Sequence, residues 1–181
     1  HINNAHMKSF SIACAYGALA HIDMLDLSHN FIGDTGMKAF SDALATGALA
    51  DLTDLFLHDN EIGDVGMQAF SAALAGGALA SATYLNLGYN KFGDVGMQAF
   101  SGALATGALA SVTDLTLSGN HKFSAVGMQS FSTALAGGAL ASLETLYVDN
   151  GPLGREHPAL KAVCLTRSIE LPRHQYIYLG A

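Results

Sequence analysis

Residues 55–74 read LFLHDNEIGDVGMQAFSAAL, and this stretch decides the fold. Leu55 and Leu57 alternate with polar or aromatic neighbours, as the inward side of a short strand does. Asn60 follows where a strand would turn, and its amide can bond the backbone of neighbouring loops. Met67, Phe70 and Leu74 then recur at roughly helical spacing. The stretch therefore predicts a strand, a turn and a helix in that order.

The same template returns with a period of 30 residues. Its strand ends are marked by Asn30, Asn60, Asn90 and Asn120. In three copies a Gly-Asp-x-Gly-Met segment precedes the helix, and we expect its aspartates to cap that helix; they are Asp34, Asp64 and Asp94. Glycines suited to helix C-terminal caps follow each helix; they are Gly47, Gly77, Gly107 and Gly138.

Four copies in register resemble leucine-rich repeats, specifically the ribonuclease-inhibitor-like subclass with a true α-helix in each unit. The Gly-Ala-Leu-Ala segments are similar to the GALA variety, and the closeness of the copies is similar to repeat families of unicellular algae. The period exceeds the usual 20–29 residues, which we attribute to an added helix turn and an alanine-rich loop. The resemblance implies an α/β solenoid. It would be a short right-handed arc with a parallel sheet on its concave face and helices on its convex face.

The copies divide the chain into three expected parts. Residues 1–20 match the helix half of a repeat, residues 21–141 hold four full repeats, and residues 142–181 form a final strand, a capping helix and a tail. Because the chain begins within a repeat, we expect either further protein before it or a partner on that end. The apolar tail at 176–179 is expected to fold back on the cap or to dock on a neighbour.

Two details are expected near the C-terminal end of the array. The fourth repeat carries one extra residue near His121, where Ser124 is a substitute helix cap. Pro158 is expected to open the last helix, which then runs to about Arg167.

Composition excludes several classes of protein. Half of the 181 residues are hydrophobic and 13% are charged, so the chain has enough apolar surface to fold. The net charge of −7 and the absence of clustered Lys and Arg argue against nucleic acid as a partner. No apolar run is long enough to span a bilayer. Cys14 and Cys164 are too far apart to bridge, so we predict buried, reduced thiols and an intracellular reducing compartment, a cytoplasm or an organelle interior; a removed targeting peptide is left open.

The sequence contains no common catalytic motif. A P-loop, H-E-x-x-H, Cys-x-x-Cys and G-x-S-x-G are all missing, so we predict a non-enzyme without cofactor or metal. One cluster is a candidate metal site. His29 and Asp59 occupy one position in adjacent repeats, with His58 and Asp26 nearby, and this donor set suits a divalent ion. Exposed His–Asp pairs on a sheet are usually solvated, so a simple pair or a partner contact is favoured.

The outward strand positions vary between repeats while the scaffold positions barely change. They mix aromatics, which supply buried area, with acids, which steer a partner. We predict that they form a partner-binding concave face; its residues are Asp26, His29, Asp54, Phe56, His58, Asp59, Tyr84, Asn86, Tyr89, Asp114, Tyr147 and Asp149. The alternative is an ordinary variable sheet surface.

These observations favour a non-catalytic protein-binding module that acts through an acidic-aromatic face on a partner with basic patches. One alternative is a structural accessory subunit of a larger, possibly organellar, assembly, docked by its open N-terminal end or its C-terminal tail. Another, which the family resemblance permits, is an enzyme inhibitor or a ubiquitin-ligase substrate receptor.

Overall fold

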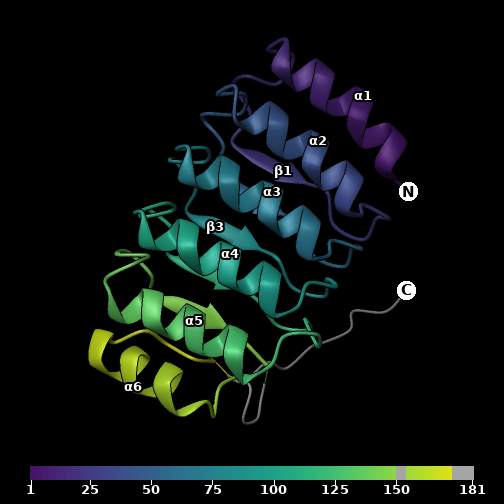
Figure 1. The fold of residues 1–181 in the computed structure, drawn as a ribbon. Helices are drawn as coiled ribbons and strands as arrows, with labels where there is room; N and C mark the ends of the chain where they lie inside the picture. Colours follow the sequence, from purple (N-terminus) through teal and green to yellow (C-terminus); the bar gives the residue numbers. More distant parts are fainter. Residues whose placement is uncertain (150–153, 173–181) are drawn as a thin grey trace.

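The computed structural model describes residues 1–149 and 154–172, in which short strands alternate with helices (Figure 1). The helices are α1 Asn4–Ala15, α2 Asp34–Leu44, α3 Asp64–Ala75, α4 Asp94–Ala105, α5 Ala125–Ala136 and α6 Pro158–Arg167. The strands are β1 Met24–Asp26, β2 Asp54–Phe56, β3 Tyr84–Asn86, β4 Asp114–Thr116 and β5 Thr145–Tyr147. Figure 1 shows the helices side by side in chain order, as a layer packed on the strands.

The strands form one parallel sheet in the order β1-β2-β3-β4-β5. The register pairs equivalent residues of successive repeats, so that Leu25 lies opposite Leu55 and Leu55 opposite Leu85. Every β-α-β connection therefore advances the chain by one strand. The predicted α/β solenoid, with a parallel sheet on one side and helices on the other, is confirmed.

The core lies between the sheet and the helices. Each repeat supplies inward leucines from its strand and a Met, Phe and Leu from its helix, and all of these side chains are buried in the full repeats. Phe40, Phe70 and Phe100 are fully buried, whereas Phe10 is only half-buried and lies 6.3 Å from the ring of Phe40. Phe10 is less buried because α1 packs against one helix, α2, rather than two.

The recurring asparagines bond the backbone of neighbouring loops, as predicted, and Asn60, Asn90 and Asn120 are buried. The amide nitrogen of Asn60 donates to the carbonyl of Leu27 at 2.9 Å and to that of Leu57 at 3.2 Å, while its oxygen accepts from Ile32 at 3.0 Å. Asn90 repeats the pattern one strand further on. Each asparagine thus satisfies backbone groups of two adjacent repeats that would otherwise be buried without partners.

The prediction that each aspartate caps the helix in which it lies was wrong. Gly33 and Gly63 hold the N-cap positions of α2 and α3 without a side-chain hydrogen bond. Asp34, in the first turn of α2, instead accepts from the backbone N–H of Gly63 at 2.7 Å and of Gly66 at 2.9 Å. A side chain inside the first turn points away from its own axis, so it reaches the N-terminus of the neighbouring helix.

The same contact recurs at each junction between repeats. Asp64 caps α4 and Asp94 caps α5. At the first junction Asn4 replaces the aspartate and accepts from Gly33 and Gly36, a role that the sequence had not suggested.

The details expected near the ends of the helices are confirmed within the described residues. Gly77 has a φ of +95°, and its N–H and that of Ala78 bond the last turn of α3 in a Schellman cap. Ser124 caps α5 through the N–H of Val126. The last helix begins at Pro158 and ends at Arg167. The tail segment 176–179 lies outside the described residues.

The two cysteines are buried, as predicted, and neither forms a disulfide. Burial raises the pKa of the Cys164 thiol to about 11 and also raises the pKa of Cys14. Both are therefore protonated and unreactive at neutral pH. Among the described residues, no helix is both long and apolar enough to cross a membrane.

Candidate functional site

The outward side chains of the strands, together with the turn residues that follow them, form a surface that we call the sheet face. The register aligns these side chains in rows across the repeats. One row runs Met24, Asp54, Tyr84, Asp114, Thr145, and the next runs Asp26, Phe56, Asn86, Thr116, Tyr147. Neighbours in a row are about 4.8 Å apart, the spacing of hydrogen-bonded strands, so their side chains can touch.

Four rings lie in contact across β1, β2 and β3 and make an aromatic strip of His29, His58, Phe56 and Tyr84. The centroids of Phe56 and Tyr84 are 4.9 Å apart with the planes tilted by 33°. Phe56 lies 6.3 Å from His58, which lies 4.9 Å from His29 edge to face. Phe56, His58 and Tyr84 are half-buried, so part of each ring remains open to a partner.

Tyr84 is half-buried in the sheet face. Burial is the main cause that raises the pKa of its hydroxyl, while the nearby side chains of Thr116 and Asn86 act to lower it.

Carboxylates border the aromatic strip, and three of them accept a hydrogen bond from a hydroxyl group. The hydroxyl of Thr53 donates to Asp54 at 2.6 Å, and that of Thr113 donates to Asp114 at 2.8 Å. Asp26 accepts from the hydroxyl and the N–H of Ser28. The side-chain hydrogen bond from Ser28 is the main cause that lowers the pKa of Asp26, so this carboxylate is ionised at neutral pH.

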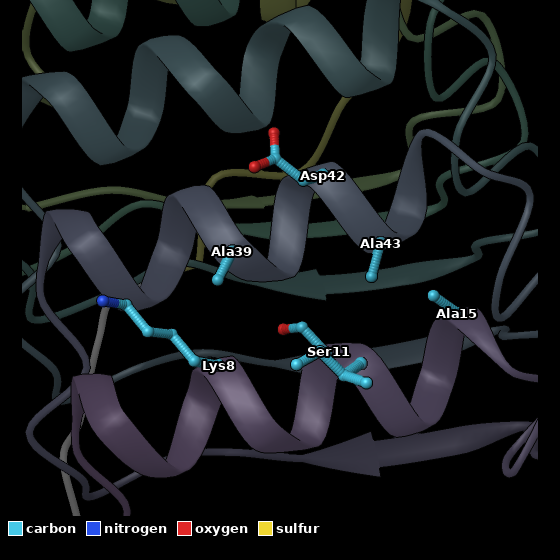
Figure 2. Close-up of a pocket in the computed structure, with 7 residues that line it drawn as sticks. Lys8, Ser11, Ala15, Ala39, Asp42 and Ala43 are labelled. Atoms are coloured by element: carbon cyan, nitrogen blue, oxygen red, sulfur yellow. The ribbon is translucent and has the colours of Figure 1, made fainter.

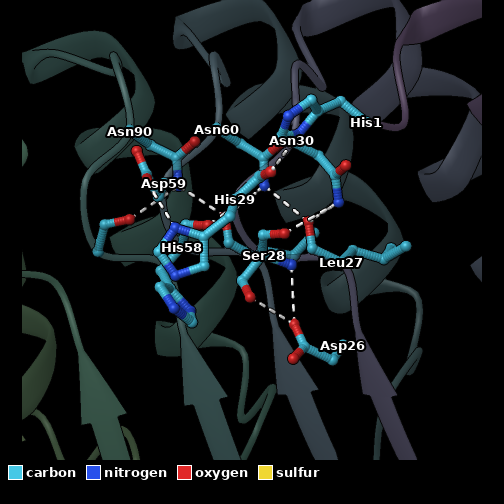
Figure 3. A network of polar contacts seen from close by, with 12 residues as sticks. His1, Asp26, Leu27, Ser28, His29, Asn30, His58, Asp59, Asn60 and Asn90 are labelled. Carbon is cyan, nitrogen blue, oxygen red and sulfur yellow. Dashed lines mark hydrogen bonds and ion pairs between the residues drawn. The ribbon is translucent and has the colours of Figure 1, made fainter. Parts of the chain in front are cut away.

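Figure 3 shows the polar network at the histidine end of the strip. The Nδ1 atom of His29 lies 2.6 Å from Asp59, and both side chains are mostly exposed, so the predicted proximity is confirmed. Nδ1 of His58 is buried without a hydrogen-bond partner among the described residues. Burial and the nearby His29 lower the pKa of His58, against the opposing pull of Asp26 and Asp59. The described residues contain no group of three His, Cys, Asp or Glu that could hold a metal.

Three turn residues on this face adopt left-handed backbone, which the sequence had not suggested. His29, Asp59 and Tyr89 have φ angles of +53°, +55° and +50°. The fourth repeat has Gly119 at the same place, with φ +78°, and a Cβ there would lie 2.7 Å from the Tyr89 ring. That single glycine was the available signal for the conformation, because glycine adopts positive φ without strain.

The structure brings most of the predicted partner-binding residues together. Asp54, Asp114 and Asn86 surround the aromatic strip, while Asp26 and Asp59 lie at its β1–β2 end. The others lie toward the turns or the last strand. Tyr89 packs on Gly119, Asp149 accepts from the N–H of Gly119 at 2.9 Å, and Tyr147 stands on β5.

Grooves lie between neighbouring helices of the helical layer. Figure 2 shows one between α1 and α2, whose lining includes Lys8, Ser11, Ala15, Ala39, Asp42 and Ala43. A second, between α4 and α5, is lined by the equivalent small residues, such as Ser101 and Ala134. Small side chains at equivalent helix positions thus line both grooves.

Comparison with known proteins agrees with this architecture. A family model described as Leucine Rich repeat matches residues 20–41, 49–71 and 83–101. A solved structure titled "Leiomodin-1 Actin-Binding Site 2 (ABS2)" superposes with a TM-score of 0.70 at 15% identity, covering 88% of this chain and 86% of that chain. At that identity the likeness shows the fold alone. A comparison with curated proteins gives no match. The fold is a leucine-rich-repeat solenoid, and the matched segments support that family.

Proposed function

We propose that this leucine-rich-repeat chain is a non-catalytic protein-binding module whose contact surface is the sheet face. Solenoids of this kind commonly bind partners on the extended surface that their stacked repeats create. The observation that carries the proposal is the position of the residues that differ between repeats. The inward strand positions repeat almost unchanged, whereas the outward strand positions differ from repeat to repeat and include two half-buried rings in contact, Phe56 and Tyr84. Half-buried aromatics amid polar groups are typical of binding hot spots.

The finer family assignment is also a proposal. A true helix of three turns in each full repeat is what the ribonuclease-inhibitor-like subclass would have, and the Gly-Ala-Leu-Ala segments favour the GALA variety. An enzyme inhibitor or a ubiquitin-ligase substrate receptor would use the same sheet face. The buried, protonated thiols Cys14 and Cys164 favour a reducing compartment.

A second candidate function is that of a structural subunit docked by the α1 end of the stack. Ile12 in α1 and Tyr16, the residue that follows α1, support it, because these large apolar residues are 59% and 89% exposed. Substituting both by serine would then release the chain from its assembly while leaving its own fold intact. Native size-exclusion chromatography measures this release.

The sheet-face proposal is tested by cross-linking in native extract followed by quantitative mass spectrometry. The double variant Phe56→Ala, Tyr84→Ala is expected to lose its cross-linked proteins by about tenfold or more, as truncation of hot-spot residues does. The control is Val65→Ala, Val95→Ala, which truncates two exposed side chains on α3 and α4. Equal recovery of partners by both double variants would overturn the proposal.

A further inference from the structure

We infer that the sheet face takes an arginine side chain of its partner, resting on Phe56 and Tyr84 and paired with Asp54 and Asp114. This inference rests on the proposed protein-binding function and names the chemistry of the ligand. It commits to an extended, arginine-bearing segment of another protein.

The first argument is position. Asp54, Tyr84 and Asp114 lie in one row on β2, β3 and β4, so a carboxylate stands on each side of the tyrosine. Phe56 is two residues beyond Asp54 on the same face of β2, and its ring contacts that of Tyr84. A group lying on the two rings is therefore within reach of carboxylates on both sides.

The second argument is preorganisation. Both carboxylates accept a hydroxyl hydrogen bond from the threonine that precedes them, from Thr53 at 2.6 Å and from Thr113 at 2.8 Å. The Tyr84 ring is half-buried and lies 4.9 Å from the Phe56 ring. Because these groups are already ordered, a cation that binds them loses little of its affinity to ordering side chains.

The third argument is charge complementarity. The strands and the turn residues that follow them carry no Lys or Arg, and they carry five aspartates: Asp26, Asp54, Asp59, Asp114 and Asp149. Two of the chain's own cations are engaged on the helical layer. Lys38 pairs with Asp42 on the helical layer, and Arg167 donates to backbone carbonyls near α5. A negatively charged face without internal cations favours a cationic ligand and disfavours a phosphate.

Arginine fits better than lysine for a geometric reason. A guanidinium group is planar, so it stacks on aromatic rings and at the same time donates hydrogen bonds in its plane to carboxylates. Lysine offers a more compact and more strongly hydrated charge, which gains less from a ring.

The test uses fluorescence anisotropy with the whole chain and labelled arginine–glycine–serine repeat peptides. Counterparts with lysine or glutamine in place of arginine serve as matched probes. We expect the arginine peptide to bind several-fold more tightly than the lysine peptide, and the glutamine peptide not to bind. Asp54→Asn and Asp114→Asn should each weaken binding of the arginine peptide by about tenfold, equivalent to about 1.4 kcal/mol. Asp42→Asn removes the same charge from the helical layer and should leave binding unchanged.

Two results would overturn the inference. One is equal binding of the arginine and lysine peptides with equal effects of all three Asp→Asn variants, which would indicate diffuse charge attraction. The other is no binding of the arginine peptide at low salt. If either occurs while the Phe56→Ala, Tyr84→Ala variant still loses its cross-linked proteins, the protein-binding function stands and only the arginine assignment fails.

Discussion

At each junction between full repeats, one aspartate carboxylate accepts hydrogen bonds from two backbone N–H groups of the repeat that follows. Asp64 illustrates it, with the N–H of Gly93 at 2.7 Å and that of Gly96 at 2.8 Å from one oxygen. The same arrangement lowers the pKa of Asp94. Burial acts to raise this pKa, but hydrogen bonds from Ser124 and Gly127 hold it below its ordinary value. This stabilisation is present above about pH 4 and is lost as the pH falls through the lowered pKa.

Replacing Asp64 by alanine should lower the free energy of unfolding by about 1–2 kcal/mol, the usual worth of a helix cap. Asp64→Asn should cost less, because Asn4 makes the same two contacts at the first junction. Urea denaturation measures both. Asp42→Ala, which removes only an exposed ion pair with Lys38, is the control and should cost about 0.5 kcal/mol or less. Equal losses for the Asp64→Ala and Asp42→Ala variants would contradict the capping role.

His58 should make stability depend on pH in a narrow window. Burial, with help from His29, lowers its folded-state pKa below the ordinary 6.5, so the unfolded chain binds the proton more readily. The free energy of unfolding should therefore fall as the pH drops below about 6.5 and level off below the folded pKa. His58→Gln should flatten this slope in thermal unfolding across that range. An unchanged slope in the His58→Gln variant would contradict this prediction.

At the scale of an element, α4 contains two glycines with opposite surroundings. A Cβ on Gly96 would lie 2.9 Å from a carboxylate oxygen of Asp64 and 2.9 Å from Cβ of Phe92, whereas a Cβ on Gly102 would meet nothing within 4 Å. Gly96 therefore allows the close approach of neighbouring repeats that the cap needs. Gly102 only lowers the helix propensity of α4.

This contrast predicts opposite effects of the same substitution. Gly96→Ala should lower the free energy of unfolding by about 1–3 kcal/mol through overpacking. Gly102→Ala should raise it by up to about 1 kcal/mol through helix propensity. Denaturant unfolding measures the free energy of unfolding of both variants. A stabilising effect of Gly96→Ala would show that the junction is looser than these distances indicate.

The sequence predicted the elements well because the repeat supplies several independent examples of each. Leu55, Met67 and Phe70 recur at fixed offsets, so chance patterns are averaged out. The cap was assigned to the wrong helix because the sequence of a repeat does not show which copy of the repeat a side chain contacts. The sequence around Asp34 is the same whether this residue caps α2 or α3. Only packing between helices decides that question.

The candidate site was predicted in part. The pairing of His29 with Asp59 followed from equal positions in adjacent repeats. The contact of Phe56 with Tyr84 did not, because these residues occupy different rows and meet diagonally through side-chain rotamers. Left-handed backbone at Tyr89 was not foreseen either, since large side chains rarely adopt it.

At the scale of the whole molecule, each repeat contacts mainly its neighbours, so stability is distributed along the array. The last described helix is fastened by Arg167, whose Nη1 donates to the carbonyls of Leu135 at 3.0 Å and Ala139 at 2.6 Å. The Leu135 carbonyl lies in the last turn of α5, and the Ala139 carbonyl lies in the loop that follows this helix.

Arg167→Ala should therefore loosen one end of the molecule only. Hydrogen exchange is expected to accelerate in α5 and α6. The free energy of local opening there should fall by about 1.5–3 kcal/mol, the contribution of a hydrogen bond to a charged group. Exchange in α2 and α3 should not change. Lys161→Ala, which removes an exposed pair with Glu156, is the control. Uniform acceleration along the chain would mean that the array unfolds as one unit.

The interlocking caps also make the joints of this solenoid interchangeable. Asp34 and Asp64 present the same carboxylate, and Gly63-x-x-Gly66 and Gly93-x-x-Gly96 present the same two N–H groups. Deleting residues 61–90 would therefore bring Asp34 to the N-terminus of α4 with its partners unchanged, and duplicating them would do the reverse. A chain built this way can gain or lose one strand of recognition surface in a single recombination step, without having to evolve a new internal interface.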